Sequence, residues 1–250
     1  MIPALLHNAD TWLDINEKAE EKLEKLQNTM FRYLFAVPES TPKPILRFDL
    51  GNLSIKEKIH VKKLNLIHHL KYLDPESLGN EFYHLQVKLN LPGLVKECRN
   101  LIRIYNLPDI IDSNLNYSKE SWKTIVKKHV RIKSELDVKK QFENYSKLKY
   151  LNTETETLKQ QEYISNLSLK NARTKFRIRS HMINTKYNRK SDKAYAADLW
   201  RCDQCRSVDT QSHILWCPAF APLREGKSLE DDKDLVCYFQ EVMRIRNDTV

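Results

Sequence analysis

The sequence predicts a mainly α-helical protein, in which a helical bundle is followed by a basic helix and a small knuckle with the ligand order Cys, Cys, His, Cys. Three observations favour this class. Only four of the 250 residues are glycine, whereas lysine, glutamate and leucine, which favour helices, are abundant. Apolar residues recur at three- and four-residue steps over long stretches. A hydrophobic content of 41% and a charged content of 30% are typical of a globular protein.

The helical pattern begins close to the N-terminus. The first expected helix covers residues 16–35, and its apolar stripe is formed by Ala19, Leu23, Leu26, Met30 and Leu34. The prolines that end it are Pro38, Pro42 and Pro44. Residues 45–48 are a candidate for a short strand. The second helix is expected to begin at Ser54, because Ser54 and Glu57 form a capping-box pattern, and to end near Asp74.

Four further stretches complete the expected bundle and the basic helix. A third helix covers about residues 80–90, and a fourth has one face made of Leu94, Cys98, Leu101, Ile102 and Tyr105. After a loop at 109–116, a long helical pattern spans 118–150, with room for one break near Asp137. Another helix begins near Thr153. We therefore expect a helical region at 1–150, a basic helical segment at 151–199, the knuckle at 200–220 and a partly helical tail at 221–250.

Positive charge is concentrated in one segment. The formal net charge is +9, and residues 170–193 carry nine lysines and arginines against one aspartate. Such a cluster favours phosphate contacts with RNA or single-stranded DNA, with Phe176 docking the helix and its basic side exposed. The expected contact residues are Lys170, Arg173, Lys175, Arg177, Arg179, Lys186, Arg189 and Lys190, with Tyr187 and Tyr195 as candidates for base stacking. The alternative is a solvated basic face that leads into the knuckle.

The knuckle is the most specific motif. Its spacing is C-x2-C-x7-H-x3-C, and the four residues are Cys202, Cys205, His213 and Cys217. Two cysteines separated by two residues suit a tight turn, and a histidine and cysteine four apart share one helical face. Four protein ligands predict one structural Zn²⁺ with no open position for water. A redox pair would need a βαβ context and a disulfide an oxidising compartment, and no signal for either is present. Trp216 and Phe220 are expected to pack over the site, or to present a ring to a base.

No catalytic centre is expected. Four glycines leave no phosphate-cradling loop. The run from Tyr195 to Asp198 lacks the second, adjacent aspartate that a polymerase needs to hold metal ions. Asp231 and Asp232 are adjacent, but they lie in a polar stretch and suit a solvated turn. With no signal peptide or long apolar run, and with Cys98 and Cys237 as free thiols, we expect an intracellular, reducing location in nucleus or cytoplasm and no membrane contact.

The order of several short segments resembles the C-terminal part of non-LTR (LINE-type) retrotransposon reverse transcriptases. Each segment alone is short, and the knuckle is the most specific of them. The matching segments are Ile2–Trp12, Glu24–Asn28, Val37–Pro42, Asp49–Gly51, Leu91–Leu94, Tyr145–Leu148, Phe176–Met182 and the knuckle through Pro218.

The resemblance implies a thumb-like helical region followed by the C-terminal zinc module, without the palm that carries the family's catalytic aspartates. In that family these parts grip template–primer and element RNA. We therefore expect a zinc-dependent module that binds RNA or single-stranded DNA and is not an enzyme. Two alternatives remain open: a structural or protein-interaction zinc module, whose partner the sequence does not identify, and a transposon-derived fragment without a function of its own.

Overall fold

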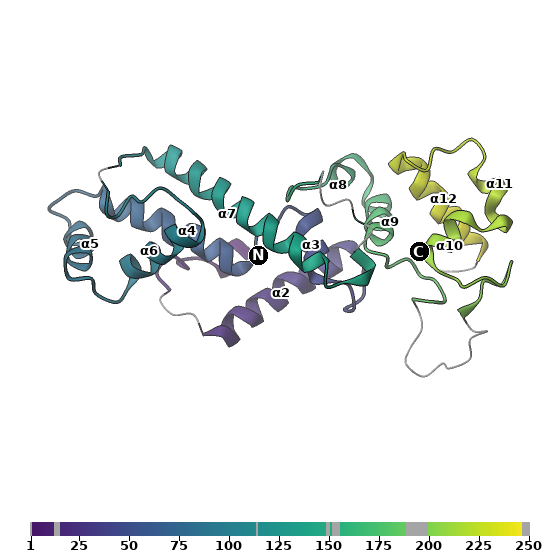
Figure 1. Cartoon of the computed structure of the whole chain (residues 1–250), viewed down its shortest axis with the longest axis horizontal. Helices are drawn as coiled ribbons and strands as arrows, with labels where there is room; N and C mark the ends of the chain where they lie inside the picture. Colours follow the sequence, from purple (N-terminus) through teal and green to yellow (C-terminus); the bar gives the residue numbers. More distant parts are fainter. Residues whose placement is uncertain are drawn as a thin grey trace. The chain divides into compact units, whose positions relative to one another are not determined.

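The structure is a computed structural model that describes residues 2–12, 16–113, 115–148, 151, 156–188 and 200–246. Helices dominate it, which confirms the predicted class (Figure 1). Within these ranges, β pairing consists of two isolated bridges, Leu50 with Gln160 and Arg201 with Val208. None of the helices in the described ranges is long and apolar enough to cross a membrane. The chain divides into two compact units, Met1–Asn28 with Gly51–Gln141, and Thr29–Leu50 with Phe142–Val250.

The first unit is a helical bundle. Its elements are α1 (Ile2–Leu5), the first part of α2 (Glu17–Phe35), α4 (Ile55–Lys71), α5 (Leu78–Leu89), α6 (Leu94–Ile104) and most of α7 (Lys119–Phe142). Its core joins apolar residues of α4, α6 and α7, including Leu64, Ile67 and Val126, none of which is exposed. Trp122 is buried among them and its indole Nε1 donates a hydrogen bond to the carbonyl oxygen of Leu64 at 2.8 Å. This bond fixes the face that α7 turns toward the core.

Two expectations for the first unit can be scored directly. The capping box is confirmed: the Ser54 hydroxyl accepts from the Glu57 amide at 3.1 Å, and the Glu57 carboxylate accepts from the Ser54 amide at 2.6 Å. The break near Asp137 is wrong, because α7 runs through that position without interruption. Val130, Ser134 and Val138 are fully buried at four-residue steps, so one continuous packed face carries the helix past Asp137.

The second unit contains the metal-site candidates. Its elements are the last part of α2, α3 (Lys43–Asp49), a 3₁₀ turn (Ser146–Leu148), α8 (Glu162–Asn166), α9 (Leu169–Arg179), α10 (Gln211–Trp216), a second 3₁₀ turn (Pro218–Phe220), α11 (Ala221–Arg224) and α12 (Asp232–Ile245). The expected strand at 45–48 is wrong, because these residues lie in α3. Pro44 sits in the first turn of that helix, where its fixed φ and missing amide favour helix initiation.

The expected helix from Thr153 into the basic segment is two short helices instead. Thr153 itself lies outside the described residues, and α8 ends before α9 begins. The Ser168 hydroxyl accepts from the Asn171 amide and so caps a new helix. Phe176 is fully buried and stacks on Phe35 with ring centroids 3.9 Å apart, which confirms that Phe176 docks α9.

Candidate metal centre

Cys202 and Cys205 lie on a tight turn. The turn is closed by the bridge between Arg201 and Val208, by a hydrogen bond from the Cys202 amide to the Ser207 carbonyl (2.7 Å), and by one from the Arg206 amide to the Cys202 carbonyl (2.9 Å). Arg206 adopts a left-handed conformation with φ of 62°, which reverses the chain just after Cys205. This local geometry turns both sulfur atoms toward the same side, as the C-x2-C spacing predicts.

His213 and Cys217 come from α10. The Thr210 hydroxyl caps this helix by accepting from the His213 amide at 3.0 Å, and Cys217 directly follows its last residue, Trp216. The four-residue separation of His213 and Cys217 spans about one helical turn, so both side chains lie on one face. A six-residue helix with a side-chain cap is thus the second of the two elements that supply the ligand pairs.

The structure brings all four predicted ligands together. Their ligand atoms all lie within 4.8 Å of one another. The Cys205 sulfur lies 3.2 Å from Nε2 of His213 and 3.7 Å from the Cys217 sulfur. A disulfide would hold two sulfurs at about 2.0 Å, and all five cysteines are free thiols, so the pairing that a disulfide would require is not present. The cluster could hold one metal ion with four protein ligands.

The surroundings of the cluster hold it in place. Cys217 and Ile214 are fully buried, and they share an apolar cluster with Phe220, Phe239 and Val242. At the end of α10, the Arg224 guanidinium donates to the carbonyl oxygens of Leu215 and Cys217, each at 3.1 Å. Phe239 and Val242 belong to α12, so the residues that support the cluster extend beyond the segment 200–220 that contains the sequence motif.

Asp209 supports the same cluster, and sequence reasoning missed it. Its side chain is fully buried, pairs with Arg246 at 2.6 Å, and accepts a hydrogen bond from the Lys186 amide, also at 2.6 Å. Asp209, which directly precedes the α10 cap, therefore connects two distant parts of the unit. These are the segment before the knuckle, through Lys186, and the end of α12, through Arg246. No local motif marks Asp209, since its partners lie 23 and 37 residues away.

The pKa shifts of His213 and Cys205 favour the forms that ligate a metal ion, whereas the shift of Cys217 opposes it. Burial lowers the pKa of His213, which keeps its imidazole in the neutral form that ligates metal ions. Burial raises the pKa of the Cys217 thiol to about 11, whereas a hydrogen bond from the Ser207 backbone lowers the pKa of Cys205. A bound cation would favour the thiolate form at each cysteine and release the protons.

The two aromatic residues beside the cluster behave differently. Phe220 is 2% exposed and packs in the core, as expected. Trp216, which precedes the ligand Cys217, is 74% exposed. The expectation that Trp216 packs over the site is wrong: its neighbours on α10, Ile214 and Leu215, supply the apolar contacts with the core, and the indole remains at the surface.

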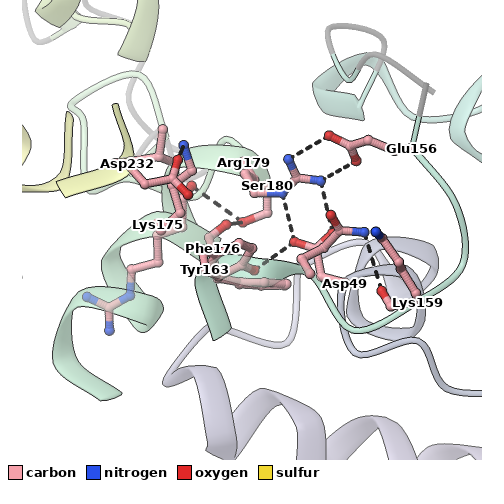
Figure 2. A network of polar contacts seen from close by, with 12 residues as sticks. Asp49, Glu156, Lys159, Tyr163, Lys175, Phe176, Arg179, Ser180 and Asp232 are labelled. Carbon is pink, nitrogen blue, oxygen red and sulfur yellow. Dashed lines mark hydrogen bonds and ion pairs between the residues drawn. The ribbon is translucent and has the colours of Figure 1, made fainter. Parts of the chain in front are cut away.

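The basic helix α9 does not present an open row of cations, contrary to the expectation that its basic side is exposed. Arg179 is the clearest case (Figure 2). Its guanidinium donates to both carboxylate oxygens of Asp49, at 2.9 and 3.1 Å, and to both of Glu156, at 3.0 and 2.6 Å. The Tyr163 hydroxyl donates to Asp49 at 2.8 Å. Asp49 is fully buried, so this network is a structural ion-pair cluster inside the second unit.

The electrostatics of this network come from burial and from the ion pairs. Burial raises the pKa of the Asp49 carboxyl, and the hydrogen bonds from Arg179 and Tyr163 oppose this rise. Burial lowers the pKa of Arg179, but Asp49 and Glu156 more than compensate and raise it above its ordinary value. Arg179 stays a cation and is held by two carboxylates, which leaves it little capacity for a phosphate.

The other predicted contact residues fall into four groups. Arg173 and Arg177 donate to the backbone carbonyls of Leu34 and Ala36, at 2.8 and 2.6 Å. Lys175 and Lys186 form ion pairs with Asp232 and Asp203. Lys170 is exposed. The predicted residues that lie outside the described part of the chain are Arg189, Lys190, Tyr195 and Asp198.

Comparison with protein-family models, with curated proteins and with solved structures yields no match. The similarity to LINE-type reverse transcriptases therefore stays a prediction from the sequence. What is established for this chain is a helical fold and a Cys3His cluster that could hold a metal ion.

Proposed function

We propose that the second unit is a zinc-stabilised module that binds single-stranded RNA or DNA and has no catalytic centre of its own. The observation that carries the proposal is the position of Trp216. A large aromatic ring that is 74% exposed directly precedes a buried metal ligand. The backbone of that ring would be fixed by the metal, so the ring offers a preformed stacking surface.

Zinc is the metal that best fits the cluster. Three thiolates and one imidazole form a common structural zinc ligand set, and sulfurs bound at 2.3 Å in a tetrahedron lie about 3.8 Å apart. The separation of 3.7 Å between the sulfurs of Cys205 and Cys217 agrees with that value. With four protein ligands, no coordination position remains for a water nucleophile, which supports a structural role for the ion.

Stacking supplies the proposed affinity. A base that stacks on an aromatic side chain contributes about 1–3 kcal/mol, and every base has a face that can stack. Arg201 and Arg206 are exposed on the turn that carries Cys202 and Cys205, and Lys170 is exposed at the start of α9. These cations can meet backbone phosphates without reading sequence. The resemblance to the C-terminal part of LINE-type reverse transcriptases supports the same function.

The test is binding of a fluorescent single-stranded RNA to the full chain, followed by anisotropy at several salt concentrations. Metal content, measured by mass spectrometry, is expected to be one zinc per chain. Trp216→Ala should weaken binding by a factor of about 5 to 150, the equivalent of about 1–3 kcal/mol. Removal of zinc by a chelator should weaken it as well, because α10 loses its metal anchor.

The matched control is Tyr33→Ala, which removes another exposed aromatic ring of the same unit. Tyr33 is 78% exposed and lies on α2, far in sequence from the metal ligands, so the affinity should stay unchanged. Equal losses for the two variants, or no loss for Trp216→Ala, would contradict the stacking role. No binding at low salt by the zinc-loaded protein would contradict the proposed function and favour a structural zinc module with a protein partner.

A further inference from the structure

A row of cations lies along one side of α7 in the first unit. Lys119, Lys123, Lys127 and Arg131 follow one another at four-residue steps, so they form a stripe along the helix. Lys123, Lys127 and Arg131 each directly follow a residue of the packed face, where Trp122, Val126 and Val130 are buried. The core therefore fixes the direction of this stripe, and places it on the flank of the buried face.

A second row of cations lies on α4, and the two rows line one pair of surface hollows. One hollow, of about 250 Å³, is bordered by Lys62 and His69 of α4 and by Lys119 and Lys123 of α7. The other, of about 400 Å³, is bordered by residues of the same two helices: Lys58, Val61, Lys127, Lys128 and Arg131, together with Leu53 just before α4.

The two hollows follow each other along the antiparallel helices α4 and α7, which Figure 1 labels. Residues 58–61 of α4 meet 127–131 of α7, and residues 62–69 of α4 meet 119–123 of α7. Leu53, Val61 and Leu66 add partly buried apolar surface to their walls. We name the two hollows together the α4–α7 groove, and lysines or arginines border both of them.

Most cations of the groove form no ion pair with a carboxylate in the part of the chain that the structure describes. Among the described residues, no salt bridge involves Lys62, Lys119, Lys123, Lys127, Lys128 or Arg131. Lys58 contacts the neutral amide of Gln27, and Asp10 is the one carboxylate among the residues that border either hollow. Like charges at this spacing repel one another, so the groove is stabilised when an anion enters it.

The length of the row selects the kind of anion. From Lys119 to Arg131 the helix rises by about 18 Å at 1.5 Å per residue. A single phosphate or carboxylate would meet one turn of this row. A nucleic-acid strand with one phosphate per 3.4 Å of helix axis would place roughly five phosphates along it. No exposed Phe, Tyr or Trp borders either hollow, and His69 is the one exposed ring among the bordering residues, so the groove offers mainly charge.

We propose that the α4–α7 groove binds the phosphate backbone of a nucleic-acid strand without reading its sequence. This site uses other residues than the metal cluster, and it lies in the other unit of the chain. The proposal therefore goes beyond the stacking role of Trp216, and each of the two can fail without the other.

The experiment compares two triple variants of the full, zinc-loaded chain. The groove variant carries Lys119→Gln, Lys123→Gln and Lys127→Gln. The control carries Lys22→Gln, Lys88→Gln and Lys96→Gln, three exposed lysines of the same unit, so the net charge changes equally. Binding of a 20-residue uridine RNA is measured against salt concentration. Each lost phosphate contact should reduce the slope of log affinity against log salt by about 0.7, and affinity at 0.1 M salt should fall by roughly tenfold or more.

The expected result is a slope about 2 units smaller for the groove variant and an almost unchanged slope for the control. Trp216→Ala should lower affinity while it leaves the slope unchanged, since stacking involves no counterion release. Equal slopes for the two triple variants would overturn the groove proposal. A second result would also overturn it. In that result the groove variant loses binding to phosphatidylserine vesicles that the unmodified chain shows, but keeps its binding to RNA.

A measurement on the unmodified chain guards against a misfolded variant. Lysine acetylation with a water-soluble reagent, read by mass spectrometry, should be slowed by the uridine RNA at Lys119, Lys123 and Lys127. It should be unaffected at Lys88 and Lys96. Inorganic phosphate at the same phosphate concentration should protect none of these lysines, because the row is matched to a polymer. Protection that is equal at all five positions would contradict the proposal.

Discussion

Two helices of this chain carry dense positive charge, and they use it in opposite ways. On α9, Arg179 is held by Asp49 and Glu156, while Arg173 and Arg177 are held by backbone carbonyls. On α7, the cations of the α4–α7 groove have no carboxylate partner among the described residues. The comparison teaches that the density of charge along a sequence does not tell whether that charge is available to a ligand. Whether a cation is available depends on whether a carboxylate that is distant in the sequence forms an ion pair with it.

The difference follows from how deeply each helix is packed. In α9 the alternate residues Ala172, Thr174, Phe176 and Ile178 are buried, so the cations between them emerge close to other elements of the unit. In α7 the buried positions recur every four residues, and a flank remains at the surface. A helix packed on several sides turns its arginines into structural residues, whereas a helix packed on one side leaves a row for binding.

The largest effect that would test this comparison is expected at Arg179. Arg179→Met leaves Asp49 and Glu156 buried or half-buried without their cation, which should destabilise the second unit by about 3–5 kcal/mol. Amide hydrogen exchange of α9, measured by mass spectrometry, reports the stability of this unit separately from the first. Lys170→Met on the same helix is the control, and it should change stability by less than about 0.5 kcal/mol because Lys170 is exposed. Equal effects would show that Arg179 does not anchor the unit.

Asp49→Asn tests the same network from its other end. The amide cannot balance the charge of Arg179, so the loss should again be about 3–5 kcal/mol. The double variant with Arg179→Met should lose less than the two single losses combined, because each change removes the partner of the other. Hydrogen exchange of α9 measures all three variants. Additive losses would contradict direct coupling between Asp49 and Arg179.

Local signals in the sequence predicted much of the structure. The pair Ser54 and Glu57 predicted the start of α4, because a capping box satisfies backbone amides within one turn. The spacing of Cys202, Cys205, His213 and Cys217 predicted a cluster that the structure assembles. Both are short-range patterns whose geometry is fixed by the chain between the residues.

The failures involve partners that are distant in the sequence. Asp49 and Arg179 are separated by 130 residues, and nothing near either of them indicates the pair. The apolar run at 45–48 suits a strand or a buried helix equally, and Pro44 favoured the helix. The cations on α7 were not predicted as a site, because the residues of α4 that border the same hollows lie far away in the sequence.

The pH dependence of the first unit should show the effect of burying a histidine close to lysines. Burial, together with Lys56 and Lys63, lowers the pKa of His60 from 6.5 to about 4. His60 is therefore protonated near pH 6.5 in the unfolded chain but only near pH 4 in the folded unit. Because the unfolded state binds the proton first, the stability of the folded unit falls as pH falls through this window. Between pH 7 and pH 5 the loss should be about 1–2 kcal/mol.

Urea unfolding of the first unit, followed at several pH values by the fluorescence of Trp122 in a chain whose other tryptophans are replaced by phenylalanine, measures this slope. His60→Gln should flatten it, whereas His84→Gln, at an exposed position of α5, should leave it unchanged. Since the His60 ring Nδ1 lies 2.7 Å from the Tyr105 hydroxyl, glutamine retains a polar partner there. An unchanged slope for His60→Gln would assign the pH dependence to other groups.

The smallest effect is expected at the more exposed ion pair of α9. Lys175 lies 2.5 Å from Asp232 in the first turn of α12, and their side chains are 13% and 41% exposed. Because water and salt screen such a pair, Lys175→Ala should cost only about 0.2–1 kcal/mol, and most of that cost should disappear in 1 M NaCl. The cost of Arg179→Met should persist in the same salt, since Asp49 is fully buried. Hydrogen exchange of α9 at low and high salt compares the two. If both effects vanished together, the cations of α9 would all be screened surface charges, and the contrast with the α4–α7 groove would rest on geometry alone.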